Sequence, residues 1–234
     1  MKTTSTLSSV VALIALSAAT ACAGPASTGA PAGPSPQAAA PAPRRANPAD
    51  VEFMSGMIHH HAQAIVMAGW SATHGASERI RTLSERIIVS QTDEIKLMQQ
   101  WLREVGEPAP EPNPRGMTMT MGGMEHTMLM PGMLSEEQMA QLDAARGTEF
   151  DRLFLTFMIQ HHEGALQMVE KLFATYGGGV DDNIYKFASD TFADQGSEID
   201  RMQKMLAELS SGGGAGGRFE RPSPGRSPST GSRT

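Results

Sequence analysis

One sequence pattern occurs twice in this chain, and it restricts the fold more than any other feature. The first copy runs from Phe53 to Met67, the second from Phe154 to Met168, and each follows an aspartate, Asp50 or Asp151. Both fit Asp-x-x-Phe-x-x-x-Met-Ile-x-His-His-x-x-Ala-x-x-Met, at a constant offset of 101 residues. A duplication of this kind predicts that the two copies occupy equivalent places in one fold.

The apolar and histidine positions of each copy recur at helical spacing. Steps of four, three, four and three residues place five side chains on one face of a helix. These faces are Phe53, Met57, His60, Ala64 and Met67 in the first copy, and Phe154, Met158, His161, Ala165 and Met168 in the second. Each copy is therefore predicted to be a helix that turns an imidazole and two thioethers inward.

A second helix is predicted after each copy, and these return helices are duplicated too. Ser77 caps the first and Gly106 ends it. At a constant offset of 104 residues, Ile80, Leu83, Gln91, Glu94, Met98 and Leu102 match Ile184, Phe187, Gln195, Glu198, Met202 and Leu206. Two antiparallel hairpins that cover each other's apolar faces predict an all-α four-helix bundle.

Composition divides the chain around this bundle. Segments rich in Ala, Pro, Gly and Ser bury too little apolar surface to offset the entropy lost on folding. The predicted organisation is a signal peptide at 1–22, a disordered Pro/Ala linker at 23–46, the bundle at 47–210 and a disordered tail at 211–234. Within the bundle, a hairpin at 47–106 and a hairpin at 148–210 flank a Met-rich connection at 107–147.

The N-terminus predicts export. Lys2, a short apolar run and small residues before Cys22 resemble a bacterial lipoprotein signal, which would anchor the chain by acylated Cys22 at the extracytoplasmic face of the cell membrane. Ala19 departs from that motif, so a conventional cleavage that yields a secreted or periplasmic protein is the alternative. Cys22 is the chain's one cysteine, which excludes an intrachain disulfide, and a net charge of −6 argues against nucleic acid as a partner.

The connection between the hairpins is unusually rich in methionine. It begins with a proline-rich run, shows no steady period, and ends with Ser135 and Gln138 in a capping box for a short helix. A loop that captures copper and a hydrophobic flap are both compatible with this composition. The candidate capture residues are Met117, Met119, Met121, Met124, His126, Met128, Met130 and Met133.

Thioether and imidazole ligands suit monovalent copper, whereas carboxylate and carbonyl oxygens suit harder cations. Buried histidines at equivalent positions of both copies also need partners. The candidate metal ligands are Met57, His60, His61, Met67, Met158, His161, His162 and Met168. Glu94, Glu198, Met98 and Met202 are candidates for a second shell or for further ligands, with the glutamates expected to accept a hydrogen bond from His60 or His161.

Two other interpretations remain open at this stage. One is a metal-free structural or interaction module at the cell surface, with a hydrogen-bonded His/Glu core. The other is a zinc or iron site of mixed His and Glu ligands, although the chain lacks the Glu-x-x-His pair of di-iron bundles. No nucleophile motif, phosphate-binding loop or dinucleotide fingerprint is present, so an enzyme is not predicted.

The doubled His-His motif, the Met-Pro-Gly-Met at Met130–Met133 and the Gln-x-x-Glu-Ile-x-x-Met of the return helix resemble the domain-of-unknown-function 305 family. The resemblance covers residues 48–209 and implies a ferritin-like four-helix bundle. Some exported members of that family bind copper through Met and His, and the resemblance to them implies metal-binding roles for the eight candidate ligands named above. We therefore expect an exported protein that sequesters Cu(I) or passes it on, and whether a second protein exchanges copper with it is left open.

Overall fold

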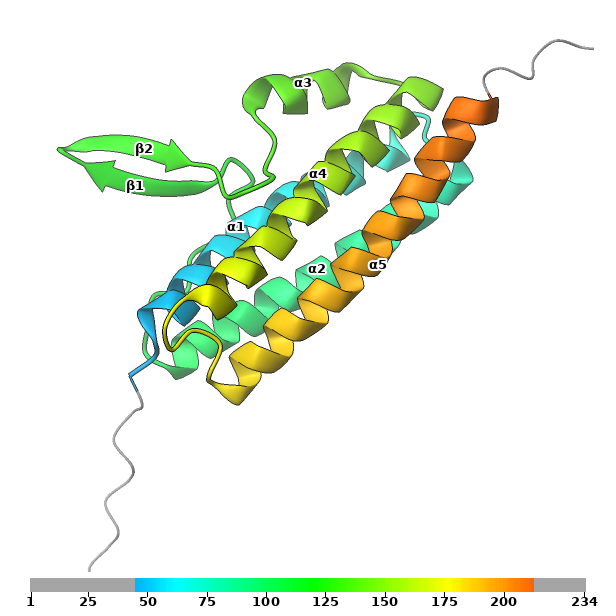
Figure 1. Cartoon of the computed structure of the whole chain (residues 1–234). Helices are drawn as coiled ribbons and strands as arrows, with labels where there is room; N and C mark the ends of the chain where they lie inside the picture. Colours follow the sequence, from blue (N-terminus) through cyan, green and yellow to red (C-terminus); the bar gives the residue numbers. More distant parts are fainter. Residues whose placement is uncertain (1–44, 213–234) are drawn as a thin grey trace, which may run out of the picture. The chain divides into compact units, whose positions relative to one another are not determined.

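The computed structural model describes residues 45–212, and four long helices dominate this part of the chain (Figure 1). The predicted signal peptide, Cys22, nearly all of the linker and nearly all of the tail lie outside the described residues. Among the described helices, none is both long and apolar enough to cross a membrane.

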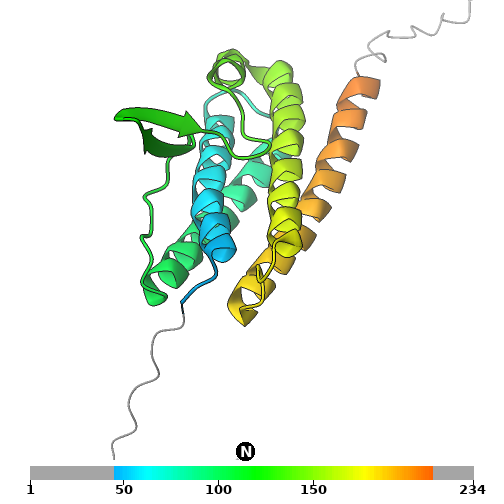
Figure 2. The same cartoon turned by 60° about the vertical axis from the view of Figure 1, so that its left-hand side comes forward.

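The long helices are α1 (Pro48–Gly69), α2 (Glu78–Glu104), α4 (Gly147–Ala174) and α5 (Asp182–Gly212). Helix α1 packs against α2 and α4, and α4 packs against α5. Chain direction alternates between these neighbours, as the colour gradients in Figures 1 and 2 show. The structure thus confirms the predicted bundle of two antiparallel hairpins.

Each helical hairpin is tied to the other by the aspartate that opens its repeat. Asp50 accepts a hydrogen bond of 2.7 Å from the Gly179 backbone amide, in the loop before α5. Asp151 accepts bonds of 3.1 and 3.2 Å from the amide of Ser77, the residue before α2. Ser77 is indeed the N-cap of α2, but its side chain makes no capping bond. The repeated aspartates therefore hold the two hairpins together reciprocally.

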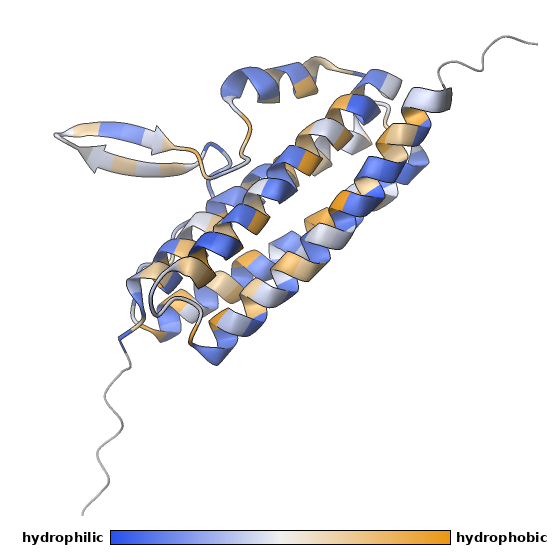
Figure 3. Ribbon diagram, viewed as in Figure 1, coloured by the Kyte–Doolittle hydropathy of each residue, from blue (hydrophilic) through white to orange (hydrophobic). Residues whose placement is uncertain are grey.

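The buried side chains form two clusters, one toward each end of the bundle. All ten residues of the two predicted inward faces are at most 8% exposed. Figure 3 shows hydrophobic and hydrophilic residues alternating along the long helices, as expected when each helix buries one face. The stripe prediction is confirmed on both repeats, and it places the histidines in the interior.

The Met-rich connection differs from the irregular loop that its sequence indicated. Strands β1 (Met117–Met121) and β2 (Met124–Met128) form an antiparallel hairpin that pairs Met117 with Met128. Gly122 and Gly123 both have positive φ, which is the backbone conformation that a two-residue hairpin turn requires. Alternating Met and Thr, which favours a strand, was the signal that the expectation of an aperiodic segment missed.

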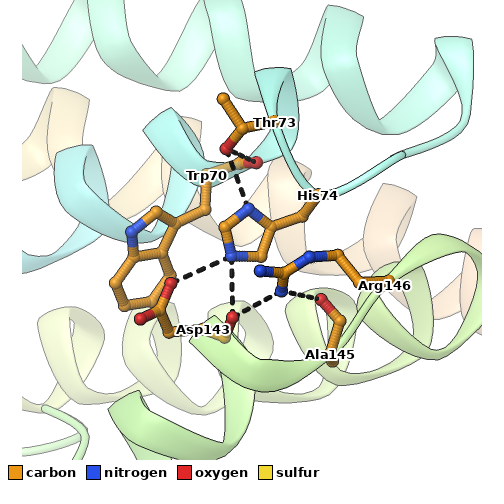
Figure 4. A network of polar contacts seen from close by, with 6 residues as sticks. All are labelled: Trp70, Thr73, His74, Asp143, Ala145 and Arg146. Carbon is orange, nitrogen blue, oxygen red and sulfur yellow. Dashed lines mark hydrogen bonds and ion pairs between the residues drawn. The ribbon is translucent and has the colours of Figure 1, made fainter.

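A short helix follows the hairpin and is fixed to the end of the first repeat. The predicted capping box of Ser135 and Gln138 is present at the start of α3 (Glu136–Ala144). The 3₁₀ turn η1 (Trp70–Ala72) extends α1, and His74 beyond it bonds through Nε2 to both the carbonyl and the carboxylate of Asp143 (Figure 4). His74 is thus a buried structural link between the bundle and α3.

Candidate metal centre

The centre of the bundle is a contact between the two repeats. His60 on α1 and His161 on α4 are fully buried, and their ring centroids lie 3.7 Å apart with an angle of 38° between the ring planes. His61 and His162, the second histidines of each pair, are fully buried as well. The fold therefore brings all four repeated imidazoles into one interior region.

Hydrogen-bond acceptors fix the tautomers of three of these rings. His60 Nε2 lies 3.1 Å from the Pro131 carbonyl, His61 Nε2 lies 2.5 Å from Glu94, and His162 Nε2 lies 2.9 Å from Glu198. Because carbonyl and carboxylate oxygens accept, each Nε2 carries a proton, and in the neutral form of the ring the Nδ1 atom presents a lone pair. The Nδ1 atoms of these three residues, and both nitrogens of His161, are buried without a hydrogen-bond partner.

The two glutamates face the imidazoles in a different way from the one expected. Glu94 and Glu198 bond to His61 and His162 rather than to His60 and His161. Adjacent residues on a helix point about 100° apart, so when His60 faces α4, His61 faces α2 within its own hairpin. The prediction named the correct carboxylates and assigned them to the wrong histidine of each pair.

Burial lowers the pKa of the central imidazoles. The pKa values of His60 and His161 lie well below the usual value of 6.5, first because burial disfavours the charged ring and then because neighbouring imidazoles repel a second positive charge. Both rings are therefore neutral at neutral pH, which is the form that binds metal ions.

The repeated methionines lie on both sides of this imidazole centre. Met57, Met98 and Met168 belong to one buried cluster, and Met67, Met158 and Met202 belong to the other. Each cluster thus combines an early methionine of one repeat, a late methionine of the other and one from a return helix. The two methionines predicted to flank the histidine of each repeat therefore lie in different clusters, one at each end of the bundle. Because α1 and α4 run antiparallel, each of them meets a methionine of the other repeat there.

The Met130–Met133 turn connects the methionine-rich hairpin to the imidazole centre. Its Pro131 carbonyl accepts the His60 bond, and a Cβ atom built at Gly164 of α4 would lie only 2.0 Å from that oxygen. A glycine at position 164 is what allows this approach. Met130 and Met133 are buried core residues, so packing accounts for these two methionines.

A pocket of about 500 Å³ opens between this turn, the β-hairpin, α1 and α4. At Gly56, inside α1, an added Cβ would lie 3.3 Å from the methyl group of Met168 and 3.8 Å from the sulfur of Met130. Glycine costs a helix about 1 kcal/mol relative to alanine, and here it leaves room for two thioether side chains. Five methionines line the pocket: Met117, Met119, Met128, Met130 and Met168.

Several candidate residues lie away from the imidazoles. Met124 and Met128 are 65% and 51% exposed, and His126 is exposed on the same strand. The buried His59, a further histidine of the first repeat, accepts a hydrogen bond at Nδ1 from the Asn113 amide. Across residues 45–212, no three His, Cys, Asp or Glu side chains are grouped so that they could hold a metal ion.

Sequence reasoning missed two features of this site. The Pro131 carbonyl is a backbone group and left no side-chain signal, although the turn that carries it was noted. Gly56 could have been found, because an isolated glycine inside a helical pattern indicates close packing or function.

Comparison with known proteins places the chain in a family. The model of the Domain of unknown function (DUF305) matches residues 50–206, which is more than half of the chain. The chain belongs to the DUF305 family. A curated relative, uncharacterized protein L153 of Acanthamoeba polyphaga mimivirus, is 40% identical over 55 residues, and this match spans 24% of our chain and 36% of that relative's length.

Solved structures share the fold of this chain. A DUF305 fragment from Deinococcus radiodurans is 28% identical, with a TM-score of 0.58 over 70% of this chain and 98% of that one. A DUF305 protein from Streptomyces coelicolor, named as a candidate secreted protein, is also 28% identical, with a TM-score of 0.57 over 69% and 94%. CopM in its Cu(I)-bound form is 25% identical, with a TM-score of 0.51 over 68% of this chain and 96% of its own.

Proposed function

We propose that this protein is an exported copper-binding protein that sequesters Cu(I), or passes it on, through histidine and methionine ligands in the helical bundle. The observation that carries the proposal is the set of buried imidazole nitrogens without partners, on rings whose other nitrogen is held by an acceptor. Histidines that bind metals are oriented in this way, by a carboxylate or carbonyl on the second nitrogen. The likeness to CopM, solved with Cu(I), Cu(II) and silver, supports the same class of ion.

The choice of Cu(I) follows from the ligand set. Neutral imidazole and thioether bind a soft monovalent ion without losing a proton, whereas a hard divalent ion would need oxygen ligands. The pairs His60/His161 and His61/His162 would supply nitrogen, and Met57, Met67, Met158 and Met168 would supply sulfur from both sides. Met98 and Met202 lie in the same clusters and are further candidates.

The methionine-lined pocket is the candidate site of capture. Its exposed thioethers from the β-hairpin would bind Cu(I) weakly and exchangeably, and Met130 and Met168 continue the sulfur lining toward the turn that holds His60. Export would place this capture site outside the cytoplasm. Acylation at Cys22 would keep the protein at the membrane surface, where an unidentified partner could deliver or accept copper.

A double substitution at the central ring pair tests the proposal. His60→Leu/His161→Leu removes the facing imidazoles and keeps an apolar core, so the variant should remain folded. We expect its Cu(I) affinity, measured by competition with a chromophoric Cu(I) chelator under reducing conditions, to fall at least 100-fold. Met139→Leu, a partly buried methionine of α3, is the matched control and should keep the wild-type affinity. A folded double variant with unchanged Cu(I) affinity would refute the role of the imidazoles.

The metal-free interaction module remains a second candidate, because the His61–Glu94 and His162–Glu198 bonds alone could satisfy a structural core. Thermal unfolding separates the two functions. A ligand that binds only the native state raises the unfolding midpoint. Under the copper proposal Cu(I) raises the midpoint of the wild type, and under the alternative it does not.

A further inference from the structure

The fourth side of the bundle, between α2 and α5, differs from the other three. The backbones of α2 and α5 lie farther apart than those of the other three neighbouring pairs, α1 with α2, α1 with α4, and α4 with α5. At one end of this side Leu83 and Met205 belong to a common apolar cluster, and at the other Trp101 packs near Phe187. Between these apolar ends lies a polar groove of about 170 Å³, which is large enough for several water-sized groups.

Oxygen-bearing side chains line this groove. They are Ser90, Gln91, Glu94, Asp194, Gln195, Ser197 and Glu198, with Arg86 at one edge. Three carboxylates against one guanidinium make the groove electronegative. Glu94 and Glu198 each use one oxygen for an imidazole, which leaves the second oxygen free to bind another group.

Two glutamines in the groove are buried without partners. Gln91 is 2% exposed and its Oε1 has no hydrogen bond, and Gln195 is 4% exposed and neither its Oε1 nor its Nε2 is bonded. Leaving a buried amide unpaired costs about 1–3 kcal/mol per group, so these side chains need a partner, either water or a bound ion, in the groove. Gln91 and Gln195, like Glu94 and Glu198, are equivalent positions of the two repeats.

We propose that the α2–α5 groove binds a hard divalent cation of the calcium type, through Glu94, Glu198 and the amide oxygens of Gln91 and Gln195. Each return helix supplies the same carboxylate and amide pair, so the ion lies between equivalent donors and links the two hairpins on their open side. Amide oxygens distinguish Ca²⁺, which accepts carboxylate, carbonyl and water ligands in flexible geometry, from Mg²⁺, which keeps most of its water. This site shares Glu94 and Glu198 with the proposed copper centre, where they bond to His61 and His162, and differs from it by the amide oxygens of Gln91 and Gln195.

Calcium titration of the full protein tests the site. Extracellular calcium modules bind in the range of about 0.1–1 mM, so 5 mM CaCl₂ should raise the wild-type unfolding midpoint by about 3 °C relative to EDTA. MgCl₂ at matched ionic strength should raise it less. An equal response to both salts, or no response to calcium, would overturn the proposal.

The matched variant is Gln91→Leu/Gln195→Leu, which removes the amide oxygens and leaves both glutamates in place. Because it replaces unpartnered polar groups with apolar ones of similar size, it should be at least as stable as the wild type in EDTA and should lose the calcium shift. Gln203→Leu, an exposed position on α5, is the control and should keep the shift. A double variant that retains the calcium shift would also overturn the proposal. Its Cu(I) affinity should be unchanged, which separates this test from that of the copper centre.

Discussion

The two repeats carry the same motif, but at one equivalent position they contact the connecting segment differently, with a long polar side chain in the first repeat and with no side chain in the second. At one position the first repeat has Gln63, which donates to the carbonyls of Pro114 and Leu134 and accepts from the Leu134 amide. The equivalent residue of the second repeat is Gly164, which the Pro131 carbonyl approaches closely. One repeat thus holds the connection by hydrogen bonds and the other by leaving space for it. As a result His60 has a backbone partner and His161 has none.

The sharpest way to break this asymmetry is Gly164→Ala. The added methyl group would overlap the backbone of Pro131, so the turn must move and the His60 bond must lengthen or break. We expect a loss of about 3 kcal/mol in the free energy of unfolding, measured by urea denaturation. The control is Gly196→Ala in α5, where an added Cβ meets nothing within 4 Å, and it should stabilise the protein by about 0.5–1 kcal/mol. Equal effects at the two glycines would contradict the close approach.

Acid titration tests whether the two central imidazoles resist protonation in the folded protein. Burial holds the pKa values of His60 and His161 well below 6.5 in the folded protein, whereas the unfolded chain protonates near 6.5. The unfolded state therefore binds more protons below pH 6.5, and stability falls as pH falls from 6.5 toward the folded pKa values. Each ring should contribute about 1.4 kcal/mol per pH unit in that window and nothing above it.

This slope can be assigned to the central ring pair. His59 also has a lowered pKa because of burial, and Asp50 has a raised pKa that acts in the opposite direction at lower pH, so we would compare free energies of unfolding only between pH 6.5 and 5. Replacing both central rings, as His60→Leu/His161→Leu, should flatten most of the slope. An unchanged slope would show that other groups cause the acid sensitivity.

The sequence predicted the duplicated features well because they are local and periodic. Helical spacing alone placed Phe53 and Met57 in the core, and the 104-residue offset identified Glu94 and Glu198 as equivalent residues. The sequence could not show which histidine each glutamate contacts. Adjacent residues on a helix point about 100° apart, and only the packing of the helices decides which of the two faces the glutamate. The bond from His60 to Pro131 joins a ring to a backbone carbonyl 71 residues away, and no side-chain pattern encodes such a contact.

The β-hairpin was the element that pattern reading described least well, because the Met/Thr alternation of β1 covers five residues and hairpin pairing depends on the turn. The methionines of the whole connection between the hairpins also divide into two groups that look alike in sequence. Met130 and Met133 fill the core, whereas Met124 and Met128 are exposed. Composition alone therefore could not separate packing residues from the candidate capture residues.

The smallest expected effect concerns the exposed methionines of the hairpin pocket. This pocket also contains Met168, from one end of the bundle, and none of the methionines clustered at the other end. Met119→Leu/Met128→Leu removes two exposed sulfurs and keeps apolar side chains of similar volume. The free energy of unfolding should change by less than about 0.5 kcal/mol. Under weak chelator competition the variant should bind fewer Cu(I) equivalents than the wild type, while its tightly held copper is unchanged. If both proteins bind the same number of equivalents, the hairpin methionines only cover the bundle and capture begins elsewhere.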